Sequence, residues 1–243
     1  MNNKNKYIDL IEYNIEKYGY HLYLISDNGP LPRISYSIGL KEKLNFELIL
    51  AGALLFNDEE IKIILDEIII KLRENRNINS VITSLGKFHL KKVNATWVNK
   101  LMLGALDYYN IDDIETLQVL PSKEYMTIDI PVLSKEYNPE QEPIWKWLTI
   151  DWIYTIPTSS TCVTNTEVLY GKQIIQAIRW EEDYWEAFSK LPSQIIEQDT
   201  KLIPLSIILE NNNSNKIIAT LLINQAVSRI DITHEWEVWN VND

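Results

Sequence analysis

The chain has 243 residues, of which 46% are hydrophobic and 23% charged, and its formal net charge is −11 at pH 7. These proportions are typical of a folded globular protein and exclude a disordered chain, which would be poor in aromatic residues. Acidic surfaces repel phosphates and anionic lipids and attract basic proteins, so we expect neither nucleic acid nor membrane as a partner. The same acidity is also common in soluble proteins that bind nothing basic.

The first half of the chain predicts alternating helices and strands. Apolar residues at helical spacing predict a helix over residues 5–18, and strands follow at 20–26, 33–40 and 46–55. Asn57 or Asp58 then caps a long amphipathic helix. Further on, the pattern predicts three more elements, which are a strand at 88–93, a helix at 97–109 and a strand at 114–121. This order indicates an α+β fold with a mixed or antiparallel sheet.

A change in composition suggests where the chain divides. Residues 134–150 contain two prolines among acidic residues and precede a restarted strand pattern, so we expect a linker there. The expected domains are therefore residues 1–133 and 151–243, both α+β. In the second domain we expect strand-like segments at 152–157, 161–169, 174–180 and 184–189, two short apolar segments at 202–210 and 215–223, and a closing strand at 228–239.

The sequence favours a reducing compartment. Cys162 is the single cysteine, so no intrachain disulfide can form. The N-terminus lacks the apolar stretch of a signal peptide, and the longest apolar runs are broken by charges. We therefore expect a cytoplasmic protein.

Motifs for catalysis or metal binding are absent from the sequence. The three histidines, His21, His89 and His234, show no zinc-binding spacing, and no basic residue adjoins Cys162 to activate it. Glycines occur singly and form no phosphate-binding loop. We expect no catalytic residue, metal or cofactor, although acids distant in sequence can still meet in a fold.

Glu47 and Gly39 lie in an otherwise apolar region, which raises the question of their purpose. Gly39 is expected to allow a tight turn after the strand that contains Tyr36. For Glu47 three roles stay open: exposure at a sheet edge, hydrogen bonds to the N–H groups of a turn, or membership of a ligand site.

The region around this turn resembles the bacterial domain of unknown function 4262 family over residues 5–133. Gly19-Tyr20 matches the start of the family pattern, and residues 36–40 match its aromatic-Thr-Ile-Gly-Leu motif with Ser in place of Thr. Residues 45–48 keep the Glu and Leu of its His-Pro-Glu-Leu motif but lack the His and Pro, and residues 117–121 match a later block. The family implies no established activity.

Residues 151–240 are similar to the immunity protein 33 group, also called domain of unknown function 2185. The matching positions are Cys162 to Thr164, Val168, Gly171, Arg179, Trp185 and Ser189. This resemblance implies a protein that binds and neutralises a toxin encoded beside it.

Two classes of function follow. The first is an immunity protein that binds a basic domain of a cognate toxin through tryptophans flanked by acids. Its expected partner-binding residues are Trp180, Glu181, Glu182, Asp183, Trp185, Glu235, Trp236 and Trp239. The alternative is an enzyme or small-ligand-binding protein with a pocket formed by His21, Tyr36, Gly39 and Glu47. For each tryptophan, packing in the core is the competing role.

Overall fold

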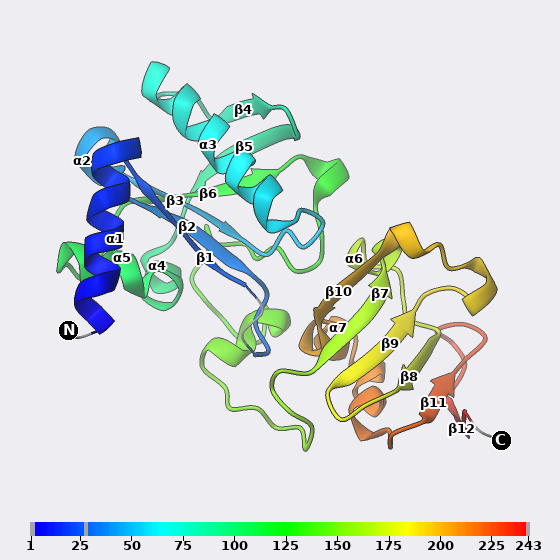
Figure 1. The fold of residues 1–243 in the computed structure, drawn as a ribbon. Coiled ribbons are helices and arrows are strands. Elements are labelled where there is room, and N and C mark those ends of the chain that lie inside the picture. Colours follow the sequence, from blue (N-terminus) through cyan, green and yellow to red (C-terminus); the bar gives the residue numbers. More distant parts are fainter. Residues whose placement is uncertain (1–2, 27–28, 242–243) are drawn as a thin grey trace. The chain divides into compact units, whose positions relative to one another are not determined.

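The computed structural model describes residues 3–26 and 29–241 and divides the chain into two compact units. Unit 1 comprises residues 1–25, 33–126 and 132–137, and unit 2 comprises 26–32, 127–131 and 138–243. Each unit contains one six-stranded mixed sheet with flanking helices, so the predicted α+β fold is confirmed (Figure 1). The expected domain limits stay a prediction. The expected linker, residues 134–150, is divided between the units: residues up to Tyr137 belong to unit 1, and residues from Asn138 belong to unit 2.

Unit 1 has the strand order β1-β2-β3-β6-β5-β4. All neighbouring strands are antiparallel except β3 and β6, which are parallel. The strands are β1 (His21–Ile25), β2 (Ile34–Ile38), β3 (Glu47–Ala51), β4 (Ser80–Thr83), β5 (Gly86–Lys92) and β6 (Thr116–Pro121). Its helices are α1 (Asn3–Tyr18), α2 (Lys41–Leu44), α3 (Asp58–Glu74), α4 (Ala95–Leu101), α5 (Leu103–Tyr109) and the 3₁₀ helix η1 (Lys123–Tyr125).

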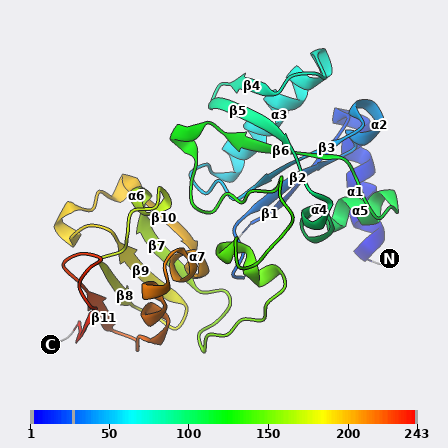
Figure 2. The same cartoon turned by 180° about the vertical axis from the view of Figure 1, so that it is seen from behind.

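Helices cover both faces of this sheet. Figures 1 and 2 show α3 over one face, with α4 and α5 over the other. The predicted apolar stripe of α3 is fully buried, and Asn57 caps the helix in a reciprocal pair with Glu60. One expected helix, over residues 97–109, is instead broken into α4 and α5 at Met102, whose φ and ψ are not helical.

Unit 2 has the strand order β10-β7-β9-β8-β11-β12, and only β7 and β9 are parallel. The strands are β7 (Thr161–Asn165), β8 (Gln176–Arg179), β9 (Tyr184–Phe188), β10 (Thr200–Pro204), β11 (Gln225–Ser228) and β12 (Glu237–Asn240). The helices are α6 (Thr166–Leu169), α7 (Leu205–Asn211), and the 3₁₀ segments η2 (Pro143–Leu148), η3 (Pro192–Gln194), η4 (Glu197–Asp199) and η5 (Asn213–Thr220).

Two expected strands of this unit are absent or shortened, and the two short apolar segments take other forms. Residues 152–157 form no strand, and residues 215–223 begin within η5. The segment 202–210 changes from β10 to α7 after Pro204, which lacks the N–H that continued pairing would use. The closing strand is limited to β12, because residues 229–236 form turns and bends.

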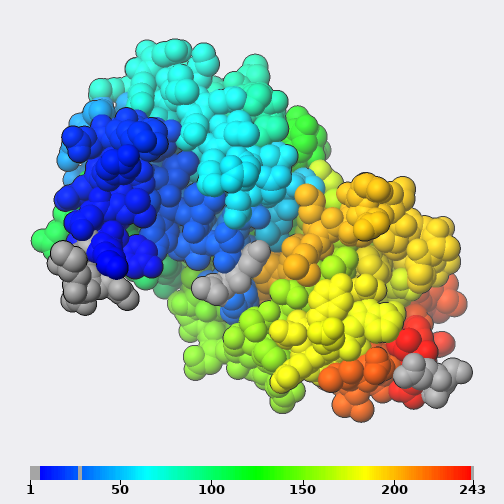
Figure 3. Space-filling model, in the orientation of Figure 1, coloured from blue at the N-terminus to red at the C-terminus, as the bar shows by residue number. Residues whose placement is uncertain are grey.

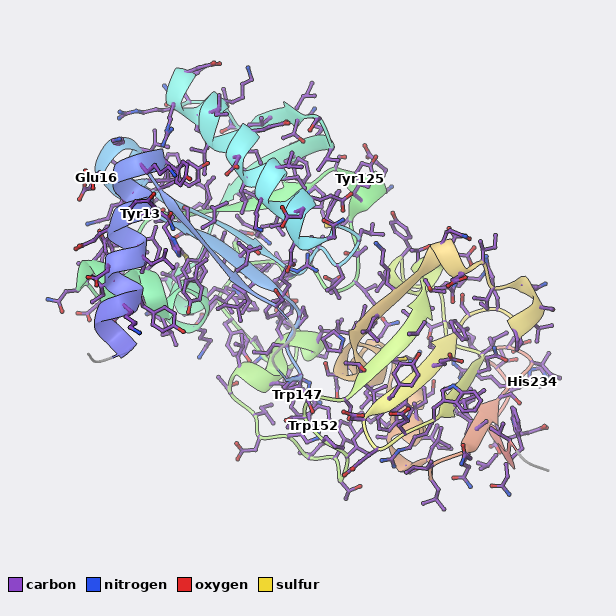
Figure 4. All side chains as sticks on the ribbon, in the orientation of Figure 1. Tyr13, Glu16, Tyr125, Trp147, Trp152 and His234 are labelled. Atoms are coloured by element: carbon purple, nitrogen blue, oxygen red, sulfur yellow. The ribbon has the colours of Figure 1, made fainter. Side chains whose placement is uncertain are left out.

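The long segment before β7 is fixed by aromatic packing within unit 2. The rings of Trp147 and Trp152, which are labelled in Figure 4, lie 4.7 Å apart, and Tyr154 packs against both. Lys146 forms a 2.7 Å ion pair with Glu210 of α7, both being largely buried. Fixing this segment on α7 adds to the packing of the helical side of the sheet.

No helix among the described residues is long and apolar enough to cross a lipid bilayer.

Gly39 forms the turn between β2 and α2. Its φ of +108° lies in a region that favours glycine, as the expected tight turn requires. A Cβ added at this position would lie 2.7 Å from Cγ1 of Ile15 and 3.2 Å from Cα of Tyr20. Both the backbone angle and the space therefore require glycine.

Replacing Gly39 by alanine should destabilise the protein by about 2–4 kcal/mol, because backbone strain and overpacking add. Gly29→Ala is the matched control: Gly29 also has positive φ, at +92°, but has no atom within 4 Å of the added Cβ. That control should cost only about 1 kcal/mol. Urea unfolding of both variants checks this, and a silent Gly39→Ala would contradict it.

Candidate functional site

Glu47 is fully buried at the start of β3, where four donors surround its carboxylate. Oε1 accepts hydrogen bonds from the backbone N–H groups of Gly39 and Lys41, both at 2.9 Å, and from the Tyr109 hydroxyl at 2.6 Å. Oε2 accepts a hydrogen bond from Ser37 Oγ at 2.5 Å. The carboxylate thus joins β2, the start of α2 and the end of α5 to β3.

Through these hydrogen bonds Glu47 links several elements of the fold. Burial raises the pKa of Glu47 above its ordinary value, and the hydrogen bonds from Ser37, Tyr109, Lys41 and Gly39 oppose that rise. No solvent reaches the side chain, so a substrate in solution cannot reach it in this conformation. Of the three roles left open by the sequence, hydrogen bonding to turn N–H groups is the one that the geometry shows.

His21 lies apart from this carboxylate cluster. It lines a separate cavity of about 400 Å³ between α1, β1 and α3. Its Nδ1 is 2.9 Å from Asn14 Nδ2, and burial lowers the pKa of the imidazole, which favours the neutral ring. Opposite, the Tyr20 hydroxyl donates to Asp66 Oδ1 at 2.6 Å. The polar rim and apolar floor of this cavity suit a small molecule.

Tyr36 takes part in neither arrangement as a polar group. Its ring is 1% exposed and stacks on Tyr23 at 5.2 Å, and burial raises the pKa of its hydroxyl. The structure therefore brings Gly39 and Glu47 together and leaves His21 and Tyr36 elsewhere. Of the four residues expected to share a pocket, only His21 lines the cavity of about 400 Å³.

The sheet of unit 2 is covered on one face only. Helix α7 and η5 pack against it, and Cys162, Trp185 and Ile203 are buried on that side. The other face is turned toward the viewer in Figure 1, where α7 lies behind the strands. In Figure 3 the β8–β9 region, in yellow, forms part of the molecular surface.

The strand registers place one residue from each strand in a row across this uncovered face. We call the row the open face; its members, in strand order, are Leu202, Val163, Glu186, Ile178, Ala226 and Trp239. Leu202 and Trp239, at the two edges, are 59% and 42% exposed, whereas Val163, Glu186 and Ile178 are half-buried and Ala226 is fully buried. Glu186, near the middle, forms no ion pair among the described residues. An apolar row with a central carboxylate suits a partner that has both apolar and basic groups.

Charge is divided unequally between the units. Unit 2 contains 17 acidic and 7 basic residues, a net charge of −10, whereas unit 1 contains 17 acidic and 16 basic residues, a net charge of −1. Almost all of the net negative charge therefore belongs to the unit with the open face. A field of one sign around such a surface speeds encounters with partners of opposite charge.

Three of the expected partner-binding acids lie on one ordered turn. Glu181, Glu182 and Asp183 are exposed in the β8–β9 connection and form no ion pairs among the described residues. The Arg179 guanidinium donates to the backbone carbonyls of Glu181 at 3.1 Å and Glu182 at 2.7 Å, and stacks 4.6 Å from the Trp185 ring centre. The turn thus presents carboxylates from a fixed backbone.

The four expected tryptophans occupy different environments. Trp185 is fully buried and packs in the core, so it presents no surface, and Trp180 is partly buried beside the acidic turn. Trp236 is partly buried under the Arg229 guanidinium, which lies 4.1 Å from its ring centre, and its Nε1 donates to the Ser214 carbonyl. Trp239 alone is both exposed and on the open face.

The remaining acid, Glu235, is exposed in the segment before β12. It lies near the end of the sheet opposite the acidic turn, because the register pairs Ser228 with Glu237 and Gln225 with Arg179. The same segment contains His234, labelled in Figure 4, whose Nδ1 is 2.9 Å from Asp231 Oδ1. Hydrogen bonds from Thr233 and His234 lower the pKa of Asp231.

Sequence reasoning missed several residues of these sites. Ser37 and Tyr109 complete the Glu47 cluster, and Ile178 and Leu202 belong to the open face. The alternation of polar and apolar residues in β8 and β9 was a usable signal for the open face. The Tyr109 contact carried no local signal, since 62 residues separate it from Glu47.

A metal or thiol site finds no support in the described residues. Within residues 3–26 and 29–241 no three His, Cys, Asp or Glu side chains cluster in a way that could hold a metal ion. Cys162 is fully buried, and burial raises the pKa of its thiol, which disfavours the reactive thiolate.

The fold and these surfaces define an α+β protein with one sheet enclosed by helices and a second, acidic sheet with an open face. Residues 14–124 match the family model described as "Domain of unknown function (DUF4262)". The resemblance of the first half of the chain to this family is thereby confirmed over the matched residues. The match lies within the span of unit 1, from α1 to η1. No curated protein and no solved structure matches the chain.

The Glu47 cluster predicts a large loss of stability on truncation. Glu47→Ala removes the acceptor of Ser37, Lys41 and Tyr109, while the Gly39 N–H keeps its bond to the Tyr109 hydroxyl, and should cost about 3–5 kcal/mol. Glu47→Gln keeps the volume and one acceptor oxygen and should cost less, about 1–2 kcal/mol. Denaturant unfolding of the two variants checks the order, and equal costs would contradict a hydrogen-bonding role.

The raised pKa of Glu47 also predicts the direction in which stability changes with pH. Because the pKa of Glu47 is raised in the folded state above its ordinary value of 4.5, folding holds this proton more tightly. The stabilisation from this proton is complete below the pKa that Glu47 has in the unfolded chain. It is lost as the pH rises through the higher pKa that Glu47 has in the folded protein. The stability advantage of the native protein over Glu47→Gln should therefore shrink as pH rises above 4.5. An advantage that grows would mean that the four donors outweigh burial.

Proposed function

We propose that the chain is a cytoplasmic immunity protein whose C-terminal unit binds and neutralises a basic cognate toxin. The observation that carries the proposal is the net charge of −10 on the unit whose sheet has an open face. The similarity of residues 151–240 to the immunity protein 33 group supports the same function. A charge of −1 on unit 1 gives that unit no comparable attraction for a basic partner.

Recognition on this surface has two parts. The carboxylates of the β8–β9 turn and Glu186 attract a basic surface over long range, which raises the association rate. Leu202, Ile178 and Trp239 offer apolar contact area, whose burial slows dissociation. Because Arg179 already orders the turn, little conformational entropy is lost there on binding.

A small-ligand site in unit 1 is the second candidate function. The cavity of about 400 Å³ lined by His21, Tyr20 and Asp66 favours it, and Glu47 is not among its lining residues. A neutral His21 in this cavity could donate and accept hydrogen bonds with a polar ligand. Serine, threonine and cysteine are not among the residues that line this cavity, and we propose binding rather than catalysis as its role.

Reversing the charge of the acidic turn should abolish protection by this protein. We expect the triple variant Glu181→Lys, Glu182→Lys, Asp183→Lys to lose growth protection when it is co-expressed with the toxin encoded beside it. Its association rate with the purified toxin should fall by roughly tenfold or more at low salt, with the difference shrinking at high salt.

The matched control makes the same change of charge in unit 1. Asp9, Glu12 and Glu16 are exposed on α1, and their triple replacement by lysine should leave protection and association unchanged. Circular dichroism confirms that both variants fold. If both variants lose protection equally, the loss is caused by the change in net charge and not by the acidic turn. If the turn variant still protects fully, the open face is not the toxin-binding surface.

A further inference from the structure

The two edges of the sheet in unit 2 are built differently. Exposed edge strands invite pairing with another chain, and proteins usually block them with lysine, proline or a covering element. Edge strand β10 contains both Lys201 and Pro204. Edge strand β12 contains neither, and all four of its residues are exposed. Among the described residues, β10 therefore carries both of these blocking residues, whereas β12 carries neither.

Strand β12 is nevertheless held firmly in place. It pairs with β11 from Ser228–Glu237 to Gln225–Asn240, and Trp239 Nε1 donates to Ser228 Oγ at 3.3 Å. The segment before it is anchored where Trp236 packs under Arg229. Since the strand is ordered in advance, a partner strand would not have to order it on binding.

The chemistry around this edge specifies the kind of strand that fits. Residues 230–243 contain four acidic residues and no lysine or arginine. Glu237 and Trp239 lie on the side of the open face, whereas Val238 points to the other side. A complementary strand would place lysine or arginine beside Glu237 and apolar residues beside Val238 and Trp239. A second copy of this chain would bring a further net charge of −10 to the same place, which opposes self-pairing.

We propose that the basic partner of unit 2 adds an extended segment to β12 as a seventh strand of the sheet. This inference rests on the proposed function, because it specifies how the same partner docks. Backbone hydrogen bonds along β12 would supply affinity, and the alternating basic and apolar side chains would supply specificity. The added strand would extend the open face beyond Trp239.

The experiment uses the full chain and a synthetic peptide, acetyl-TKVYTK-amide, with acetyl-TEVYTE-amide as the like-charged control. Amide hydrogen exchange is followed residue by residue. The basic peptide should slow exchange in β12 and leave β10 unchanged, and the acidic peptide should slow neither. Binding of the basic peptide without protection of β12 would overturn strand addition, as would an absence of binding at millimolar concentration.

Two variants of the chain test whether the basic peptide binds at β12. Glu237→Lys should weaken binding of the basic peptide roughly fivefold, because it replaces a cross-strand attraction by a repulsion. The matched control, Glu197→Lys, makes the same change at an exposed position beside the edge strand β10 and should leave binding unchanged. Equal weakening in both variants would contradict a docking site at β12.

A third variant separates this inference from the proposed function. Val238→Pro removes an N–H from the edge and should abolish both peptide protection and toxin neutralisation, with circular dichroism to confirm folding. If Val238→Pro still neutralises the toxin while the charge-reversed turn does not, the toxin docks on the open face without strand addition. If both variants neutralise it, neither the acidic turn nor β12 binds the toxin; if the unaltered chain fails to neutralise it, the proposed function itself is wrong.

Discussion

The buried carboxylate of Glu47 is the interaction on which the architecture of unit 1 depends. A single side chain accepts hydrogen bonds from the end of β2, the start of α2 and the end of α5. The turn it closes has room only for glycine at position 39. Burying a carboxylate is costly unless its oxygens are satisfied, so these donors must be positioned together and the elements that carry them become interdependent.

Unit 2 is organised by a different constraint, which is the covering of a sheet on one face only. Helical segments bury Trp185 and Cys162 on one side, and the other side retains apolar residues with a central carboxylate. Arg179 links the two sides: its guanidinium stacks on the buried Trp185 and bonds to carbonyls of the acidic turn. Core packing thereby fixes the position of surface charges, which is the condition under which charge complementarity gives specificity.

The sequence patterns predicted those features of the fold that depend on interactions between residues close together in the chain. The apolar stripe and Asn cap of α3 and the glycine turn at Gly39 were readable because each depends on neighbours within a few residues. The break at Met102 and the change from β10 to α7 were missed, since both lie within continuous apolar runs whose secondary structure tertiary packing decides. The pairing of Glu47 with Tyr109, and the row that joins Leu202 to Trp239, depend on long-range topology and could not be derived from spacing.

The unequal distribution of charge is compatible with a division of labour between the units. Unit 1 balances its acids with 16 basic residues and encloses its sheet, an arrangement that favours a self-sufficient fold with at most a small-ligand cavity. Unit 2 keeps ten uncompensated negative charges although like charges repel and reduce stability. Solubility alone would be served by charge spread over both units. Its concentration beside an apolar, uncovered sheet instead favours a surface selected for a basic partner, because that partner removes the repulsion when it binds.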